Sequence, residues 1–193
     1  MKNTNDSELI ALKSTLHNLS ILKPFLHQKI LHTGRLYEIA LSSVNIETKK
    51  EYILAGYYCN IGFLMIEESL YKDKYTTSND IGLIQRHNLI AADLMHEKGF
   101  NLVGDIIKLH HEKPNGTGYL KIQQKEKYIG LLCLVDEFID SVVYSRKPEP
   151  VLTVEEAIGY AFKHYDNGLM FSQAEVKILK ELFLDYYKSK IRQ

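Results

Sequence analysis

The chain of 193 residues has little of what marks several classes of protein. Basic and acidic residues number 24 each, so nothing electrostatic favours a nucleic acid polymer or an anionic membrane as a partner. The longest stretch without a charged residue, 52–66, has 15 residues, which is too short to span a bilayer comfortably. The polar N-terminus lacks the apolar core of a signal peptide.

Cysteine is also scarce. The two cysteines, Cys59 and Cys133, lie far apart in the sequence, each inside an apolar segment. This arrangement favours reduced thiols over a disulfide scaffold. We therefore expect a cytoplasmic protein.

Proline is rare, with four residues, and strand-like alternation of apolar and polar residues is scarce. Apolar residues recur instead at helical spacing along almost the whole chain. Thr153 with Glu156 and Ser172 with Glu175 are capping-box pairs that predict helix starts, and 52–66 is expected to form one buried helix. The sequence thus predicts an all-α protein, a single helical bundle of seven to nine helices. Residues 1–24 would form an N-terminal helical extension and residues 25–193 the helical domain.

Histidine is the residue type whose count is high, at eight. His32 and His87 fall inside apolar helical segments, His110 and His111 end a short one, and Asp136 lies in a long one. A buried carboxylate is costly unless a cation neutralises it. Neutral imidazole and carboxylate are good ligands for first-row divalent ions. These five residues are therefore the candidate ligands of a metal site inside the bundle.

A structural interpretation of the same residues is open. A histidine on an apolar helix face is commonly a core residue with a hydrogen-bond partner, and the pair at 110–111 suits a helix C-terminus, where imidazole complements the dipole. Asp136 would then cap a neighbouring helix or pair with a cation. The cations considered for it are Arg35, Arg86 and Lys127.

The stretch 110–120, HHEKPNGTGYL, resembles the HHExxDGxGYP signature of HD-GYP proteins, a branch of the HD phosphohydrolase superfamily. Four other segments resemble segments of that family in the same order. They are 31–41 (LHTGRLYEIAL, with His32), 55–66 (AGYYCNIGFLMI), 86–95 (RHNLIAADLM, with His87) and 129–148 (IGLLCLVDEFIDSVVYSRKP, with Asp136). The resemblance covers roughly residues 25–190.

The resemblance implies a helical bundle of the HD/HD-GYP type with two or three metal ions, usually iron or manganese. It implies hydrolysis of cyclic di-GMP by metal-bound hydroxide, with the five candidates as ligands. A loop after the histidine pair would line the substrate channel or meet a partner protein. The loop residues concerned are Glu112, Asn115, Gly116, Gly118 and Tyr119.

The sequence departs from this family where the family carries charge. The histidine–aspartate doublet that names the superfamily is replaced by Cys59 and Asn60, and an uncharged amide is a poor bridge between two metal ions. The family's lysine after the doublet, its additional glutamate ligand and its arginine before the last ligand helix are also absent. Phe63, Gln28 and Gly130 stand in their places.

From these departures we expect a regulatory or binding module in bacterial cyclic di-GMP signalling with little or no phosphodiesterase activity. It would bind a cyclic dinucleotide or dock a signalling protein such as a diguanylate cyclase, hold one iron or manganese ion or none, and a homodimer is open. One alternative is an active metal-dependent phosphohydrolase with a mononuclear or cysteine-containing site. Another is an all-α interaction domain in which the site is a fossil.

Overall fold

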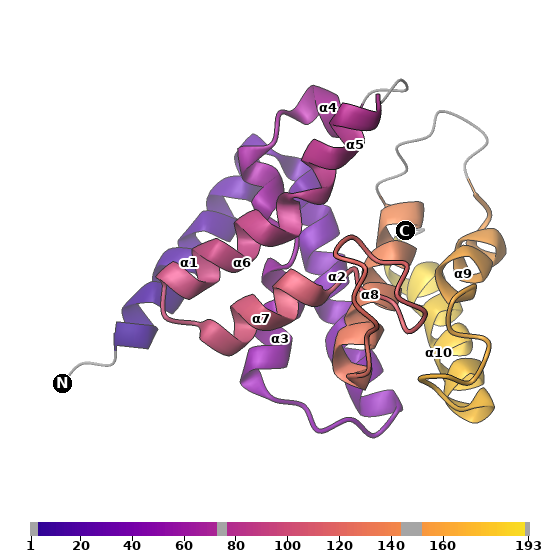
Figure 1. The fold of residues 1–193 in the computed structure, drawn as a ribbon. Coiled ribbons are helices and arrows are strands. Elements are labelled where there is room, and N and C mark those ends of the chain that lie inside the picture. Colours follow the sequence, from indigo (N-terminus) through magenta and orange to yellow (C-terminus); the bar gives the residue numbers. More distant parts are fainter. Residues whose placement is uncertain (1–3, 73–76, 144–151, 192–193) are drawn as a thin grey trace.

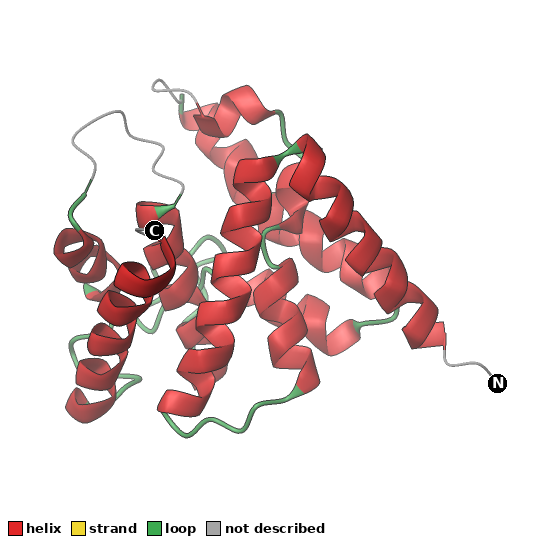
Figure 2. Ribbon diagram, turned by 180° about the vertical axis from the view of Figure 1, so that it is seen from behind, coloured by secondary structure: helices red, strands yellow, loops and turns green. Residues whose placement is uncertain are grey.

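The computed structural model describes residues 4–72, 77–143 and 152–191, and every regular element in these ranges is helical (Figures 1 and 2). The prediction of an all-α fold is confirmed. Within the described ranges, no helix combines the length and apolar character that crossing a membrane requires. The elements in chain order are α1 Thr4–Leu22, α2 Pro24–Ser43, α3 Lys50–Tyr58, the 3₁₀ helix η1 Ile61–Met65, α4 Glu68–Lys72, α5 Ser78–Gln85, α6 His87–Glu97, α7 Asn101–Leu109, α8 Lys127–Val142, α9 Val154–Phe162, α10 Gln173–Tyr186 and the π turn η2 Tyr187–Ile191.

Local sequence signals set several helix boundaries. Pro24 takes the first turn of α2, where its missing N–H costs nothing, and so separates α2 from α1. Thr153 and Ser172 accept the backbone N–H of Glu156 and Glu175, and both capping boxes are formed as predicted.

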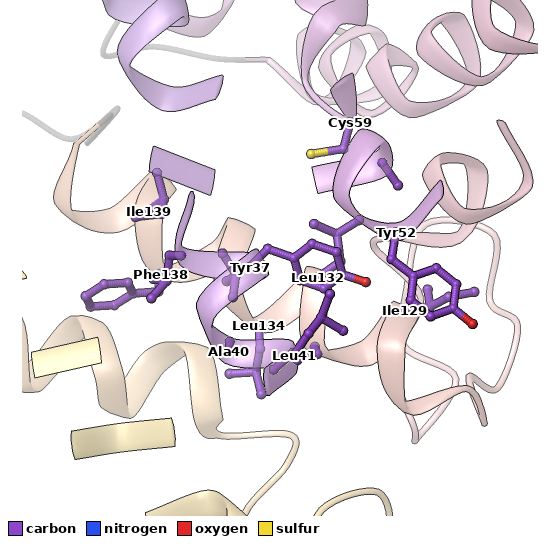
Figure 3. Close-up of a cluster of buried hydrophobic side chains, with 14 of the residues drawn as sticks. Tyr37, Ala40, Leu41, Tyr52, Cys59, Ile129, Leu132, Leu134, Phe138 and Ile139 are labelled. Carbon is purple, nitrogen blue, oxygen red and sulfur yellow. The ribbon is translucent and has the colours of Figure 1, made fainter. Parts of the chain in front are cut away.

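The centre of the bundle is the packing of α2 against α8 and α3. The helices α1, α4, α5 and α6 lie on one side of this centre, and α9 and α10 lie on the other (Figure 1). Figure 3 shows part of the core, with Tyr37, Ala40 and Leu41 of α2 near Leu132, Leu134 and Phe138 of α8, all fully buried. The hydroxyl of Tyr37 donates to the carbonyl of Tyr128 at 2.8 Å, which satisfies the polar atom that this packing buries. The assignment of 1–24 as an extension stays a prediction, although α1 does contact α2.

The expected continuous helix over 52–66 is wrong. The helix α3 ends at Tyr58, and the chain turns through Cys59 and Asn60 into η1. Gly62 lies so close to the backbone carbonyl of His87 that a Cβ at this position would overlap it. The break therefore lets this turn approach the start of α6 and places Asn60 and Phe63 beside the predicted site.

Candidate metal centre

Three of the predicted ligands lie together in the interior. His87 is the first residue of α6, His110 follows the last residue of α7, and His111 is next in the chain. One ring nitrogen from each lies within 4.8 Å of the other two, and all three side chains are buried. The antiparallel packing of α6 on α7 creates this histidine triad, because it brings the start of one helix beside the end of the other.

The triad is held by hydrogen bonds that orient two of its rings. Nδ1 of His87 is 2.8 Å from the carbonyl of Ile84, and Nδ1 of His110 is 2.6 Å from the carbonyl of Ile107. A carbonyl only accepts, so both Nδ1 atoms carry the hydrogen and both Nε2 atoms present a lone pair. Metal-binding histidines are commonly fixed by such a bond from the other ring nitrogen.

These two lone pairs meet Nε2 of His111 inside the cluster. Nε2 of His87 lies 3.1 Å from Nε2 of His111, so His111 donates to it. Nε2 of His110 is buried and has no hydrogen-bond partner among the residues that the structure describes. A buried acceptor without a partner is costly, and a cation at this point would satisfy it.

Burial also favours the neutral form of the three rings. It lowers the pKa of His110, and it lowers the pKa of His87 and His111 well below the usual value, with further lowering by the neighbouring imidazoles and by Lys29. Neutral rings are the form that binds a metal ion.

Asp136 of α8 lies beside the triad, and its partners were not those expected. Its Oδ1 accepts from the Asn60 amide, and its Oδ2 lies 3.7 Å from Nζ of Lys29 and 3.8 Å from Nε2 of His111. Lys29 is also fully buried, and its Nζ lies 2.7 Å from Oδ1 of Asp140. The cation that neutralises Asp136 is therefore Lys29.

The three cations considered from sequence are elsewhere. Arg35 and Arg86 are exposed, and Lys127 pairs with Glu175 at 2.8 Å. Burial alone would raise the pKa of Asp136, but Lys29, then His110 and the Asn60 amide, outweigh burial and hold that pKa below its usual value.

The structure does not bring His32 into the cluster. Its Nδ1 lies 3.0 Å from the hydroxyl of Tyr186 on α10, and the side chain is only half-buried. Lys29 and Thr33, one turn apart on α2, face Asp136 instead, with Oγ1 of Thr33 at 3.5 Å. Gln28, expected in place of the additional glutamate ligand, is exposed. The expected set of five ligands is thus reduced to the triad with Asp136 beside it.

The doublet Cys59–Asn60 is buried next to Asp136. Nδ2 of Asn60 donates both to Asp136 at 2.5 Å and to Sγ of Cys59 at 3.3 Å, while its Oδ1 has no partner among the described residues. Burial raises the pKa of the Cys59 thiol well above its usual value, and its sulfur is not among the atoms that converge in the histidine triad.

The other departures from the family pattern fill space. The ring of Phe63 stacks on that of His87, and Nζ of Lys29 lies 5.2 Å from the centroid of Phe63. A Cβ at Gly130 would overlap the sulfur of Met170, so glycine at this position permits the close packing of Met170 against α8.

The loop after the triad is closed by Glu112. Its buried carboxylate accepts the backbone N–H groups of Leu120 and Ile122 at 2.8 and 2.7 Å, and Gly118 lies directly against it. Glu112 is therefore occupied in holding the loop in shape rather than free to contact a ligand.

The same loop covers part of the triad. The ring of Tyr119 stacks on His111 with centroids 4.3 Å apart. Asn115 accepts from Thr117 and contacts Nδ1 of His164 through its amide, and Gly116 takes a positive φ of 71° at the turn. The role of this loop in a substrate channel or partner contact stays a prediction.

Comparisons with protein-family models and with curated proteins find no match to the chain. Among solved structures, the chain is similar to the HD domain of the phosphodiesterase PgpH of L. monocytogenes, with 15% identity over 90% of this chain and 96% of that one and a TM-score of 0.66. It is also similar to that HD domain in complex with cyclic-di-AMP, with 13% identity over 92% and 97% of the chains and a TM-score of 0.68. At such low identity the likeness shows the fold, and the prediction of an HD-type bundle is confirmed at that level.

The donor set fits one divalent ion. Three neutral imidazoles converge, two have carbonyl-bound Nδ1 atoms, and one Nε2 lacks a partner. It does not fit a bridged pair of ions, because Asn60 aims an amide donor at Asp136, whose charge Lys29 already balances. Lys29 was missed from the sequence, although Leu26, Lys29, Ile30 and Thr33 follow the buried face of a helix.

Proposed function

We propose that this chain is an HD-fold binding module that holds one divalent ion on His87, His110 and His111 and binds a cyclic dinucleotide without turning it over at ordinary enzyme rates. The observation that carries the proposal is the orientation of Asn60. At the position where the resembled family has a bridging carboxylate, this chain presents an uncharged amide whose nitrogen points at Asp136. A donor at that point repels a metal ion.

Hydrolysis in the HD-GYP family, which the sequence resembles, depends on two metal ions that share a bridging group. Such a pair activates water and stabilises the charge that develops at phosphorus. Removing groups of this kind typically lowers rates by about two orders of magnitude or more. Loss of the bridge in this chain, together with the loss of the family's lysine at Phe63, supports binding without efficient turnover.

Binding itself is supported by chemistry that remains. A single ion on the triad would supply a Lewis-acidic centre for a phosphate oxygen, with iron or manganese as the expected metal. Tyr119 lies against His111 at the edge of the site and offers an aromatic face on which a base can stack. The ligand class follows from the motif resemblance, which points to cyclic di-GMP, and from a fold neighbour whose structure contains cyclic-di-AMP.

A second candidate is a phosphohydrolase that works with one ion. The intact triad, with the unpartnered Nε2 of His110, favours it. A bound ligand would in either case serve as an input to a signalling partner, for which a diguanylate cyclase is the expected type.

Equilibrium dialysis separates these proposals. Protein purified without chelators is loaded with Mn²⁺, its metal content is measured by elemental analysis, and binding and hydrolysis of cyclic di-GMP and cyclic-di-AMP are followed by chromatography. We expect one ion per chain, saturable binding of one of the two dinucleotides, and intact ligand after prolonged incubation. His110→Ala should abolish metal and ligand binding, whereas His17→Ala, an exposed position on α1, should not.

Two outcomes would replace the proposal. Turnover within the usual enzyme range of about 1–10³ s⁻¹ would establish the phosphohydrolase. A protein that stays metal-free after reconstitution and binds neither dinucleotide would leave the histidines as core residues of an interaction domain.

A further inference from the structure

Lys29 is a buried cation within the candidate metal centre. Its side chain is 3% exposed, and its Nζ lies between two carboxylates of α8, 3.7 Å from Asp136 and 2.7 Å from Asp140. The side chain crosses from α2 to α8 beside Phe63, whose ring stacks on His87. The ammonium group is thus inside the site and close to the triad, not on its rim.

Asp136 has a cationic partner without a metal ion. Asp136 is a fully buried carboxylate, and a buried carboxylate needs a cation and hydrogen bonds to remain charged. Lys29 supplies the cation, and the side chains of Asn60 and Thr33 contact Oδ1 of Asp136. In a centre with two bridged metal ions, a metal ion bound to Asp136 would neutralise the same carboxylate.

We infer that Lys29 takes the place of a second metal ion: its ammonium group occupies the cation position at Asp136 and limits this centre to one ion. This inference rests on the proposed function, because it takes the histidine triad as a site for an ion. A tethered ammonium and a divalent ion repel each other strongly at short range in a buried site. Unlike a metal ion, the lysine cannot dissociate, so the charge of Asp136 stays balanced in the presence of a chelator.

The test counts metal ions in a set of variants, a readout that does not depend on activity. Wild type, Asn60→Asp, Lys29→Met and the double variant Lys29→Met/Asn60→Asp are dialysed against Mn²⁺, and manganese per chain is measured by elemental analysis. Methionine is chosen because it has a similar length and no charge. Asn60→Asp restores the bridging carboxylate and leaves Lys29 in place.

The deciding quantity is the difference in manganese per chain between the double variant and Asn60→Asp. We expect one additional ion per chain in the double variant and no additional ion in Asn60→Asp relative to wild type. Equal metal content in the double variant and Asn60→Asp overturns the inference, as does a second ion in Asn60→Asp alone. If wild type binds no ion, the proposed single-ion site fails, while this difference still decides the role of Lys29.

Thermal unfolding keeps the inference testable where the variants are unstable. Removal of Lys29 takes away the cation that stabilises the buried carboxylate of Asp136, so Lys29→Met should melt at a lower temperature in EDTA, and Mn²⁺ should recover more of that loss than it adds to wild type. A variant that is unfolded in EDTA and regains helical circular dichroism with Mn²⁺ supports the inference. One that stays unfolded, or whose melting temperature Mn²⁺ does not raise, overturns it.

Lys113→Met provides the matched control. Lys113 also pairs with a carboxylate of α8, with its Nζ 2.6 Å from Glu137, and both side chains are mostly buried. It lies outside the group around Asp136. Its removal should lower the melting temperature without creating a Mn²⁺-dependent recovery or a second ion.

Discussion

The ring of Phe63 lies parallel to the ring of His87, with centroids 4.2 Å apart and 13° between the planes. The residue that replaces a family lysine thus packs flat on a candidate ligand. Because Nδ1 of His87 is bonded to the carbonyl of Ile84, the stack and the hydrogen bond together fix the ring. A fixed imidazole loses less conformational entropy when it binds an ion.

Phe63→Ala should therefore weaken both folding and metal binding. Phe63 is 3% exposed, and truncation of a buried phenylalanine costs about 3–5 kcal/mol. Urea denaturation measures the loss in stability, and titration with Mn²⁺ measures the affinity of the triad. Met65→Ala is the control, since Met65 is 78% exposed two residues later. An unchanged metal affinity in Phe63→Ala would show that the stack does not position His87.

Gly62→Ala should disturb the same histidine from the backbone side. A Cβ at Gly62 would overlap the carbonyl of His87, and backbone cannot move aside as a side chain can. Overpacking of this kind typically costs about 1–3 kcal/mol. Gly82→Ala on α5 is the control because nothing lies near its Cβ, and there alanine should stabilise by roughly 0.5–1 kcal/mol through helix propensity. Urea midpoints that shift in the same direction for both variants would contradict the close approach.

The pH dependence of stability should include a term from His32. Burial, and then Arg35, lowers the pKa of His32 below its usual 6.5. The unfolded chain then takes up a proton at a higher pH than the folded one, so the contribution of His32 is complete above pH 6.5 and is lost as the pH falls through the folded pKa. His32→Gln should flatten the fall in stability between about pH 7.5 and 5.5. Equal slopes in wild type and His32→Gln would contradict the assignment.

The sequence predicted the helical fold because that prediction depends on periodicity and caps, which are local. It also predicted His87, His110 and His111 as candidate metal ligands, and α6 and α7 bring their ring nitrogens together. It could not place side chains around a helix with equal accuracy. A shift of a single position on α2 separates Thr33, which faces Asp136, from His32, which contacts Tyr186.

The buried ammonium group of Lys29 was also not predicted. Imidazole is a common metal ligand and an ammonium group is not, so the pattern of candidate ligands did not include a lysine. The break after Tyr58 was missed for another reason. It depends on the contact between Gly62 and His87, which are far apart in sequence, and the apolar run 52–66 carries no local sign of it.

Glu112 holds the loop that follows the histidine triad. Both carboxylate oxygens accept backbone N–H groups, from Leu120 and Ile122. Glu112→Gln keeps the size of the side chain but replaces one acceptor by a donor, which cannot pair with an N–H group. A hydrogen bond to a charged group contributes about 1.5–3 kcal/mol, and the loss should fall mainly on this loop.

Hydrogen exchange followed by mass spectrometry checks this expectation. Peptides that contain 118–122 should exchange faster in Glu112→Gln, while those from the core of α8 should be unchanged, because no hydrogen bond of that helix involves Glu112 among the described residues. Tyr119, which stacks on His111, should move with the loop, so ligand binding should weaken more than metal binding. Glu47→Gln, with its side chain 83% exposed, is the control. Equal protection of 118–122 in Glu112→Gln and wild type would mean that the loop keeps its shape without the carboxylate, and Glu112 would then be free to act on a ligand.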